Sequence, residues 1–299
     1  MSCRSPTKPT AWRTMRLPTD LSLAELQQAI FQQLPPEFDD ASASVLVLLA
    51  HVLHLPKTWL LAHPEARLSP EQTEQLSQLA QRFALGEPLA YLTGRQEFFG
   101  LVFKVSPAVL IPRPETELLV EVALTWLCEL GRPAHMLDLG TGSGCIALTL
   151  ASQVPSLRVT ASDVSADALE IARENARELK VSERVTFLQA DLILETLPRF
   201  DLICANLPYI PTRKLSTVNS IAYEPGTALD GGADGLHLLR PFFRQAPRHL
   251  LKPGLLLAET EAGLGPETLT IARENFPEAR TELLQDLHNR DRMVQVQLA

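Results

Sequence analysis

Long hydrophobic runs are absent from the 299-residue sequence. A transmembrane helix needs about 20 consecutive, mostly apolar residues, so we expect no membrane segment. Residues 1–19 also lack the short apolar core of a secretory signal, and they carry four basic residues and no acidic one. We predict that they form a disordered extension. A targeting peptide is one alternative, and a start-site artefact with Met15 as the true first residue is another.

Cysteine is scarce, and its spacing is not that of a metal site. Cys3, Cys128, Cys145 and Cys204 are scattered along the chain, and three of them lie in apolar surroundings. Small buried thiols of this kind are typical of a protein in a reducing compartment. We therefore expect a cytoplasmic protein with no bound metal.

Basic residues are too few to form an obvious surface for nucleic acid. The net charge is −8, and the four basic residues within 1–19 leave the rest of the chain more acidic still. Proteins that bind duplex DNA usually present a basic face. We expect no direct nucleic-acid binding.

The first third of the chain has a helical pattern. Residues 20–86 place apolar residues at helical spacing behind two N-terminal capping signals, at Ser22 and Ser69. We predict a small helical domain over this range. Residues 87–111 then contain two short β patterns joined at Gly100, which predicts a β-hairpin linker.

Residues 112–299 alternate between short apolar strands and helices. Because parallel strands need a crossover connection, this order predicts an α/β domain with a doubly wound, parallel sheet. The last two strands, near 281–285 and 293–298, have only a short connector between them. We expect these two strands to pair antiparallel.

A glycine-rich loop follows the first strand of this domain. Its sequence, DLGTGSG over 138–144, places backbone N–H groups at a helix N-terminus and lets a ligand approach closely. Asp163 ends the next strand, where a carboxylate commonly binds ribose hydroxyls. The glycines lack the G-x-G-x-x-G spacing of dinucleotide sites, so we predict another adenosine ligand. Asp138 is a candidate partner for an ammonium group, and Asp191 for the adenine region.

The fourth strand, 200–205, is an apolar run that ends at Asn206-Leu207-Pro208-Tyr209. Pro208 pushes Leu207 toward extended geometry, so the Leu207 carbonyl need not join a helix or a ladder. That carbonyl and the Asn206 side-chain oxygen are adjacent acceptors, which suit a planar NH2 group. We predict that they orient an amide or amino nitrogen toward an electrophile, beside the aromatic face of Tyr209. A plain strand-ending turn is the alternative.

Together these motifs resemble the seven-stranded S-adenosylmethionine-dependent methyltransferases, and specifically the peptide chain release factor N(5)-glutamine methyltransferase family. The resemblance covers about residues 22–299. Besides the glycine loop and the NPPY-type motif, the resemblance rests on four further segments. They are RQEFFG at 95–100, VLIPRPETE at 109–117, the stretch with EP at 224–225 and LDGGADGL at 229–236, and NRDR at 289–292. It implies a Rossmann-like sheet with an antiparallel C-terminal strand.

The family pattern implies transfer of a methyl group from S-adenosylmethionine to the amide nitrogen of the glutamine in the release factor's GGQ motif. Asn206 and the Leu207 carbonyl would hold that amide, Pro208 would shape the turn, and Tyr209 would pack the substrate. Leu207 replaces the usual proline but keeps the backbone acceptor. The helical domain would recognise the release factor, and we expect a monomer. The residues implied to bind the cofactor are Asp138, Leu139, Gly140, Thr141, Gly142, Asp163, Asp191, Leu192 and Asn206.

Other functions stay open on the sequence alone. A methyltransferase for a DNA amino group would share the NH2-holding motif, but it would need a base-flipping pocket and a basic groove. Methylation of a ribosomal-protein glutamine is harder to exclude. A catalytically silent cofactor-binding adaptor is disfavoured by the intact set of Asp138, Asp163 and Asn206, and an NAD-dependent dehydrogenase by the glycine spacing. Arg113 is a further candidate, for contact with an anionic ligand.

Overall fold

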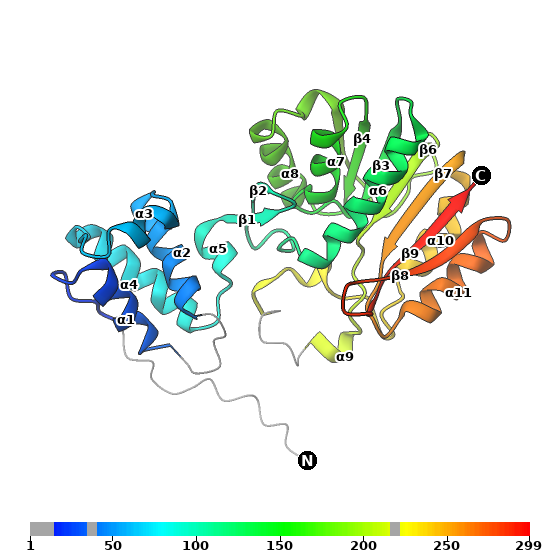
Figure 1. Ribbon diagram of the computed structural model, residues 1–299. Coiled ribbons are helices and arrows are strands. Elements are labelled where there is room, and N and C mark those ends of the chain that lie inside the picture. The colour runs from blue at the N-terminus through cyan, green and yellow to red at the C-terminus, as the bar shows by residue number, and fades with distance from the viewer. Residues whose placement is uncertain (1–14, 35–40, 216–221) are drawn as a thin grey trace, which may run out of the picture. The chain divides into compact units, whose positions relative to one another are not determined.

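The computed structural model describes residues 15–34, 41–215 and 222–299 (Figure 1). The extension expected over 1–19 therefore lies mostly outside the described residues. The chain forms two compact units, residues 1–93 and residues 94–299.

The N-terminal unit is a set of short helices around one apolar core. Ser22 and Ser69 cap α1 and α4, and each forms a capping box with the residue three positions later, as their sequence signals indicate. Met15 and Leu17 are buried against this core. Two helices, α3 and α5, are too short to give a full apolar period in the sequence. The helices are α1 (Leu23–Phe31), α2 (Ala41–Leu53), α3 (Lys57–Ala62), α4 (Pro70–Ala84) and α5 (Leu89–Thr93).

The C-terminal unit begins with an antiparallel hairpin of β1 (Arg95–Phe98) and β2 (Leu101–Lys104). Phe99 and Gly100 form its turn, and both have positive φ, 51° and 73°. Two consecutive residues of this kind match the right-handed twist of the flanking strands. The predicted hairpin around Gly100 is thus present.

Seven strands form one sheet in the order β5-β4-β3-β6-β7-β9-β8. The pairs from β5 to β7 are parallel, and β9 is antiparallel to both β7 and β8. This confirms the predicted doubly wound sheet with an antiparallel C-terminal strand. The strands are β3 (His135–Leu139), β4 (Arg158–Asp163), β5 (Val185–Gln189), β6 (Phe200–Ala205), β7 (Leu250–Glu259), β8 (Arg280–Gln285) and β9 (Asp291–Leu298).

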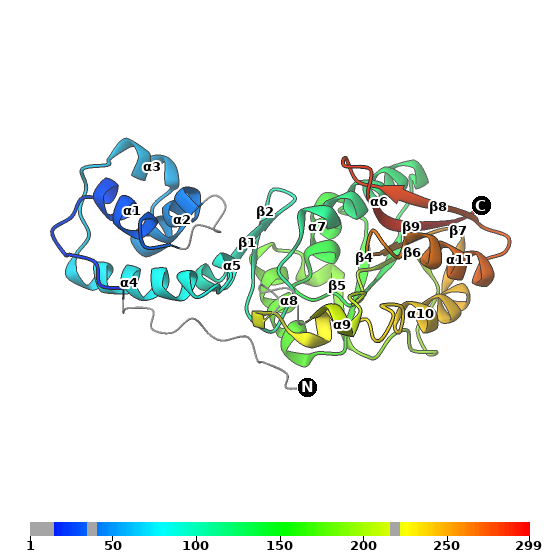
Figure 2. The ribbon, with the colours of Figure 1, turned by 90° about the horizontal axis from the view of Figure 1, so that it is seen from below.

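Helices cover both faces of this sheet (Figure 1). Successive residues of a strand point to opposite faces, so on β3 Met136 packs with α6 and α7 while Leu137 packs with α10 and α11. Figure 2 shows α10 and α11 grouped beside β7. The helices are α6 (Glu117–Leu130), α7 (Cys145–Gln153), α8 (Ala166–Glu178), α9 (Thr212–Leu215), α10 (Leu239–Gln245) and α11 (Gly265–Asn275), with 3₁₀ turns η1 (Pro114–Thr116), η2 (Ser182–Arg184), η4 (Gly226–Ala228) and η5 (Ala246–Arg248).

The order of the strands places a ligand site. β3 and β6 are neighbours, although β4 and β5 lie between them in the sequence. The chain therefore winds outward in one direction from β3 and in the other from β6. In open α/β sheets the crevice at such a switch point, beyond the carboxyl ends of the strands, binds the ligand. Within the described ranges, no helix is both long and apolar enough to cross a bilayer.

Candidate active site

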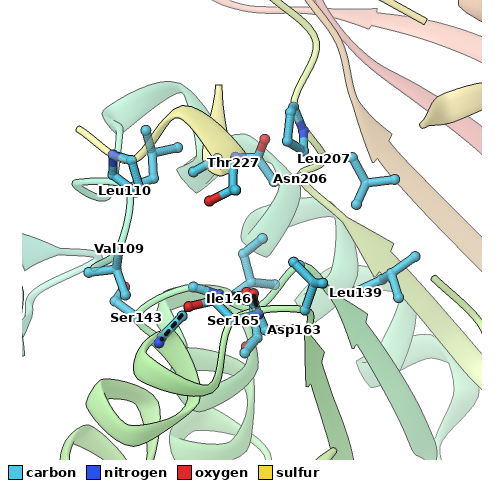
Figure 3. Close-up of a pocket in the computed structure, with 18 of the residues that line it drawn as sticks. Val109, Leu110, Leu139, Ser143, Ile146, Asp163, Ser165, Asn206, Leu207 and Thr227 are labelled. Atoms are coloured by element: carbon cyan, nitrogen blue, oxygen red, sulfur yellow. Dashed lines mark hydrogen bonds between the residues drawn. The ribbon is translucent and has the colours of Figure 1, made fainter. Parts of the chain in front are cut away.

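A pocket lies at this switch point (Figure 3). Asn206 and Thr227 lie on one side of it, Asp163 and Ser165 lie opposite, and Val109 with Leu110 comes from a separate segment. The wall is built from the glycine loop, the ends of β4, β5 and β6, residues 108–110, 112, 113 and 116, and residues 225, 227 and 228. Residues distant in the sequence thus converge on one cavity.

The glycine loop is held against the neighbouring strand. The backbone N–H groups of Gly140 and Thr141 both donate to the Ser162 carbonyl, at 2.8 and 2.9 Å. Gly144 has φ of 83°, and a Cβ there would lie 2.8 Å from Leu148. The loop therefore needs glycine at 144 both for its backbone conformation and for space.

Asp163 lines the pocket and is anchored by the backbone on both sides. Its carboxylate oxygens accept from the Gly142 N–H and the Ser165 N–H, each at 2.9 Å. Burial raises the pKa of Asp163, although these N–H groups act to lower it. Each carboxylate oxygen can accept more than one hydrogen bond, so the group is still able to bind ligand hydroxyls.

Asp138 lies behind the loop, and it is not among the described residues of the pocket wall. Its Oδ2 accepts from the Thr141 hydroxyl at 2.6 Å, while its buried Oδ1 has no hydrogen-bond partner among the described residues. Burial raises the pKa of Asp138 to about 7, against smaller opposing contributions from the Thr141 hydroxyl and the Ala147 N–H. The sequence indicated a carboxylate at this position but not that its side chain is buried.

The Asn206–Tyr209 segment begins directly beside the glycine loop. Leu139 of β3 pairs with Ala205 of β6, and a Cβ on Gly140 would lie 3.3 Å from the Leu207 side chain. The Leu207 side chain is buried in the apolar cluster under α10, and its carbonyl accepts no hydrogen bond from the described residues. The residue that replaces the usual proline is therefore held by packing, with its acceptor free.

The Asn206 side chain belongs to a chain of hydrogen bonds that the sequence did not reveal. Its Nδ2 donates to Thr116 Oγ1 at 3.2 Å, and Thr116 Oγ1 donates to Glu259 Oε2 at 2.7 Å. Tyr209 Oη donates to the other carboxylate oxygen, Glu259 Oε1, at 2.9 Å. Glu259 is only 3% exposed, and burial raises its pKa. Burial and the neighbouring Glu259 likewise hold the pKa of Tyr209 well above its ordinary value.

Arg113 lines the pocket, but its charge is already paired. Its guanidinium binds Glu224, whose side chain is 1% exposed, and Glu224 also accepts the Ile111 N–H at 3.3 Å. Pro225 and Thr227, just beyond Glu224, are part of the wall. The ion pair therefore ties this loop to the segment around Arg113, which leaves Arg113 poorly suited to bind an anionic ligand.

The LDGGADGL loop holds the other end of the Asn206–Tyr209 segment. Ile210 N–H donates to the Leu229 carbonyl at 3.0 Å, and Gly231 N–H donates back to the Ile210 carbonyl at 2.8 Å. A Cβ on Gly235 would lie 2.5 Å from the Tyr209 carbonyl oxygen. Only glycine allows so close an approach of two backbones.

Most of the predicted site residues meet at the pocket, whereas Asp138 and Tyr209 lie behind its wall. Thr116 and Glu259 are the polar residues that sequence reasoning missed. Thr116 stands within the VLIPRPETE segment, and Glu259 ends β7, so their places at strand or helix ends were the available signals. The predicted residues on the wall are Leu139, Gly140, Thr141, Gly142, Asp163, Asp191, Leu192, Asn206, Leu207 and Pro208.

Comparison with known proteins gives the family. Residues 25–94 match the PrmC N-terminal domain, and residues 115–232 match the methyltransferase small domain. A release factor glutamine methyltransferase from Moorella thermoacetica is 45% identical over 252 residues, which cover 82% of this chain and 87% of that protein. One from Vibrio cholerae is 39% identical over 254 residues, covering 84% and 88%.

A solved structure shares the fold. The T. thermophilus 16S rRNA N2 G1207 methyltransferase, in complex with AdoMet and guanosine, has a TM-score of 0.50 at 18% identity. The match covers 69% of this chain and 50% of that one. The length and identity of the sequence matches decide the assignment: the chain belongs to the release factor glutamine methyltransferase family.

Proposed function

We propose that this protein transfers the methyl group of S-adenosylmethionine to the side-chain amide nitrogen of the glutamine in the GGQ motif of peptide chain release factors. The observation that carries this proposal is the pair of acceptors at the pocket wall, the Asn206 side chain and the free Leu207 carbonyl. The segment that carries the pair packs against the glycine loop: a Cβ on Gly140 would lie 3.3 Å from the Leu207 side chain and 3.5 Å from the Asn206 backbone oxygen. The substrate amide, which receives the methyl group, and the methyl donor would therefore meet in one cavity.

The residues of the pocket suit S-adenosylmethionine. The glycine loop and the Asp163 carboxylate offer contacts for an adenosine moiety. Ser143 Oγ, on the pocket wall, is a buried polar atom without a partner among the described residues, and it would accept from a donor of the ligand. Asp138 Oδ1, just behind the glycine loop, also lacks a partner among the described residues. When bound, this cofactor supplies a methyl group on a sulfonium, which is electrophilic without further activation.

The protein's own contribution is orientation of the amide. Asn206 Oδ1 would accept one hydrogen of the glutamine NH2, and the Leu207 carbonyl would accept the other. Both acceptors then stabilise the positive charge that develops on the nitrogen as its new bond to carbon forms. As this bond forms, the bond from the methyl carbon to sulfur would break and leave a neutral thioether. The nitrogen would then release one of its two protons to water, so no strong base is needed beforehand.

The helical unit is proposed to recognise the release factor. We assign this role to residues 20–86, which overlap the match to the PrmC N-terminal domain over 25–94, and we propose 87–111 as a linker and 112–299 as the methyltransferase domain, which includes the match over 115–232. We propose that the protein works as a monomer in the cytoplasm, without direct nucleic-acid contact. The free thiols of Cys128, Cys145 and Cys204 are consistent with a reducing compartment.

A methyl-transfer experiment tests the proposal. The purified protein and an Asn206→Ala variant are incubated with S-adenosylmethionine and unmethylated release factor, and the added methyl is mapped by peptide mass spectrometry. We expect a methyl on the GGQ glutamine that is lost in Asn206→Ala and kept in Asn275→Ala, which lies on α11. Transfer to a ribosomal protein or to DNA, with none to the release factor, would overturn it.

A further inference from the structure

We propose that Glu259 is a positioning residue, which sets through Thr116 the direction in which the Asn206 amide faces. This inference rests on the proposed function, in which Asn206 must present its oxygen to the substrate NH2. An asparagine side chain has nearly the same shape when its oxygen and nitrogen are exchanged. Only its hydrogen-bond partners decide which of the two atoms faces the pocket.

The fold brings the three residues together from separate elements. Ala205 of β6 pairs with Ala258 of β7, so Asn206 and Glu259 each come one residue after this pair, at the ends of adjacent parallel strands. Thr116 ends η1 and is 1% exposed. The three side chains therefore form a chain of hydrogen bonds that runs from Asn206 and Thr116, on the pocket wall, to the buried Glu259 behind it.

Glu259 fixes which atom donates and which accepts in each of these hydrogen bonds. Both Glu259 oxygens act as acceptors here, since each receives one hydroxyl hydrogen, from Thr116 at 2.7 Å and from Tyr209 at 2.9 Å. The Thr116 hydroxyl has one hydrogen, and it donates this hydrogen in its hydrogen bond to Glu259. Toward Asn206 it can then only accept, and it does so from Nδ2 at 3.2 Å. Asn206 Oδ1 is left for the substrate.

Removing the carboxylate would remove this direction. The Thr116 proton would be free to turn toward Asn206, and the amide would then rotate to offer Oδ1 to the hydroxyl. Nδ2 would face the substrate NH2, which places donor against donor. Glu259 thus favours one of two otherwise similar rotamers, and it does so without touching the substrate.

Several charged groups surround Glu259. Burial raises the pKa of Glu259, against smaller opposing contributions from the Thr116 and Tyr209 hydroxyls and from Arg292 on β9, while Glu115 on η1 adds to the rise. Arg292 also pairs with Asp286 at 2.9 Å and with Glu115 at 3.6 Å. The Tyr209 phenol and the Cys145 thiol are titratable groups that also interact with the carboxylate. The NRDR segment, which contributes Arg292, thereby supports the same network.

The test uses the full-length protein with S-adenosylmethionine and release factor. Thr116→Val deletes the hydroxyl at nearly constant shape. We expect kcat to fall by about tenfold, because the Asn206 amide loses the one hydrogen bond that favours its productive orientation. Cofactor affinity and melting temperature should stay near wild type. Thr116→Ser restores the hydroxyl and should restore kcat. Thr149→Val is the matched control, because Thr149 is buried and its hydroxyl has no partner among the described residues.

A double variant separates positioning from a general structural role. Glu259→Gln can orient its amide either way, so it should lower kcat on its own. If Glu259 acts through Thr116, the Glu259→Gln/Thr116→Val double variant should be no slower than Thr116→Val alone. In ¹⁵N-labelled protein, the Asn206 side-chain NH2 resonance, assigned by its absence in Asn206→Asp, should shift in both single variants and not in Thr149→Val.

The outcomes are distinct. Wild-type kcat in Thr116→Val, additive losses in the double variant, or an unmoved Asn206 resonance would each overturn the positioning role. Failure of the wild type to methylate release factor would overturn the proposed function instead. The NMR comparison would still decide the orientation of Asn206 in that case.

Discussion

Gly231 packs directly on the backbone of Tyr209: a Cβ built on Gly231 would lie 2.7 Å from both the Cα and the carbonyl carbon of Tyr209. The backbone φ of Gly231 is not in the left-handed region, so the requirement for glycine is one of space. The Asn206–Tyr209 segment is thus clamped between the glycine loop at one end and the LDGGADGL loop at the other. Its geometry depends on both contacts.

Gly231→Ala should therefore weaken both the fold and the site. The added methyl meets backbone atoms that have little freedom to move, and overpacking of this kind costs about 1–3 kcal/mol. Urea unfolding should show this loss, and methyl transfer should fall more than cofactor affinity. Gly226→Ala is the control, since a Cβ at Gly226 meets nothing within 4 Å. Equal free energies of unfolding for the two variants would contradict the clamp.

The Arg113–Glu224 pair gives a second prediction. Arg113→Met leaves a buried carboxylate without its partner, and we expect a destabilisation of about 2 kcal/mol, below the usual range for fully buried pairs because Arg113 is 38% exposed. Glu224→Gln should lower the free energy of unfolding by less than Arg113→Met does, because it removes the buried charge itself. The exposed Arg248–Glu195 pair is the control, and Arg248→Met should be near neutral. A ranking with Glu224→Gln as the more damaging change would refute this account.

Asp138 makes stability depend on pH. Burial raises the pKa of Asp138 in the folded protein to about 7, from an ordinary 3.8. Between pH 3.8 and pH 7, the folded protein therefore keeps a proton on Asp138 that the unfolded chain has lost. Its contribution to stability is therefore present at low pH and is lost as the pH rises through 7. From pH 5 to pH 8 the wild type should lose about 2–3 kcal/mol relative to Asp138→Asn.

Urea unfolding at the two pH values measures this difference. Asp163 and Glu259 shift in the same direction, so the comparison with Asp138→Asn is needed to isolate Asp138. Asp286→Asn serves as the control. The pKa of Asp286 is lowered to about 2, so its effect on stability changes only at more acidic pH. A difference between wild type and Asp138→Asn that stays constant would rule out a raised pKa for Asp138.

Removing the helical unit should separate recognition from chemistry. We expect a variant that lacks residues 20–86 to keep its affinity for S-adenosylmethionine but to lose methylation of intact release factor. A short peptide that contains the GGQ motif is the control substrate, because it offers no surface beyond the pocket for the helical unit to bind. Equal loss of cofactor binding and of methylation would count against this division of labour.

Local chemistry explains which parts of the site the sequence could predict. The glycine loop and the Asn206–Tyr209 segment each specify their own backbone through glycine and proline, and strand order brings them together. The alternation of strands and helices likewise predicted the sheet.

Contacts between distant residues were beyond local patterns. Thr116 and Glu259 are 143 residues apart, and Arg113 and Glu224 are 111 apart. No periodicity or spacing rule joins such pairs, because they meet only once the sheet has formed. Asp138 shows a related limit: its residue type indicated a ligand contact, but its burial depends on the packing of the whole loop.

The two hydrogen bonds from Gly140 and Thr141 to the Ser162 carbonyl have a consequence for biosynthesis. They join the loop after β3 to the end of β4, so the loop takes its shape only when these two central strands are paired. A newly made chain in which β4 has not yet docked therefore lacks these two contacts of the loop. If the loop binds the cofactor as proposed, cofactor binding during synthesis would report that β4 has docked beside β3.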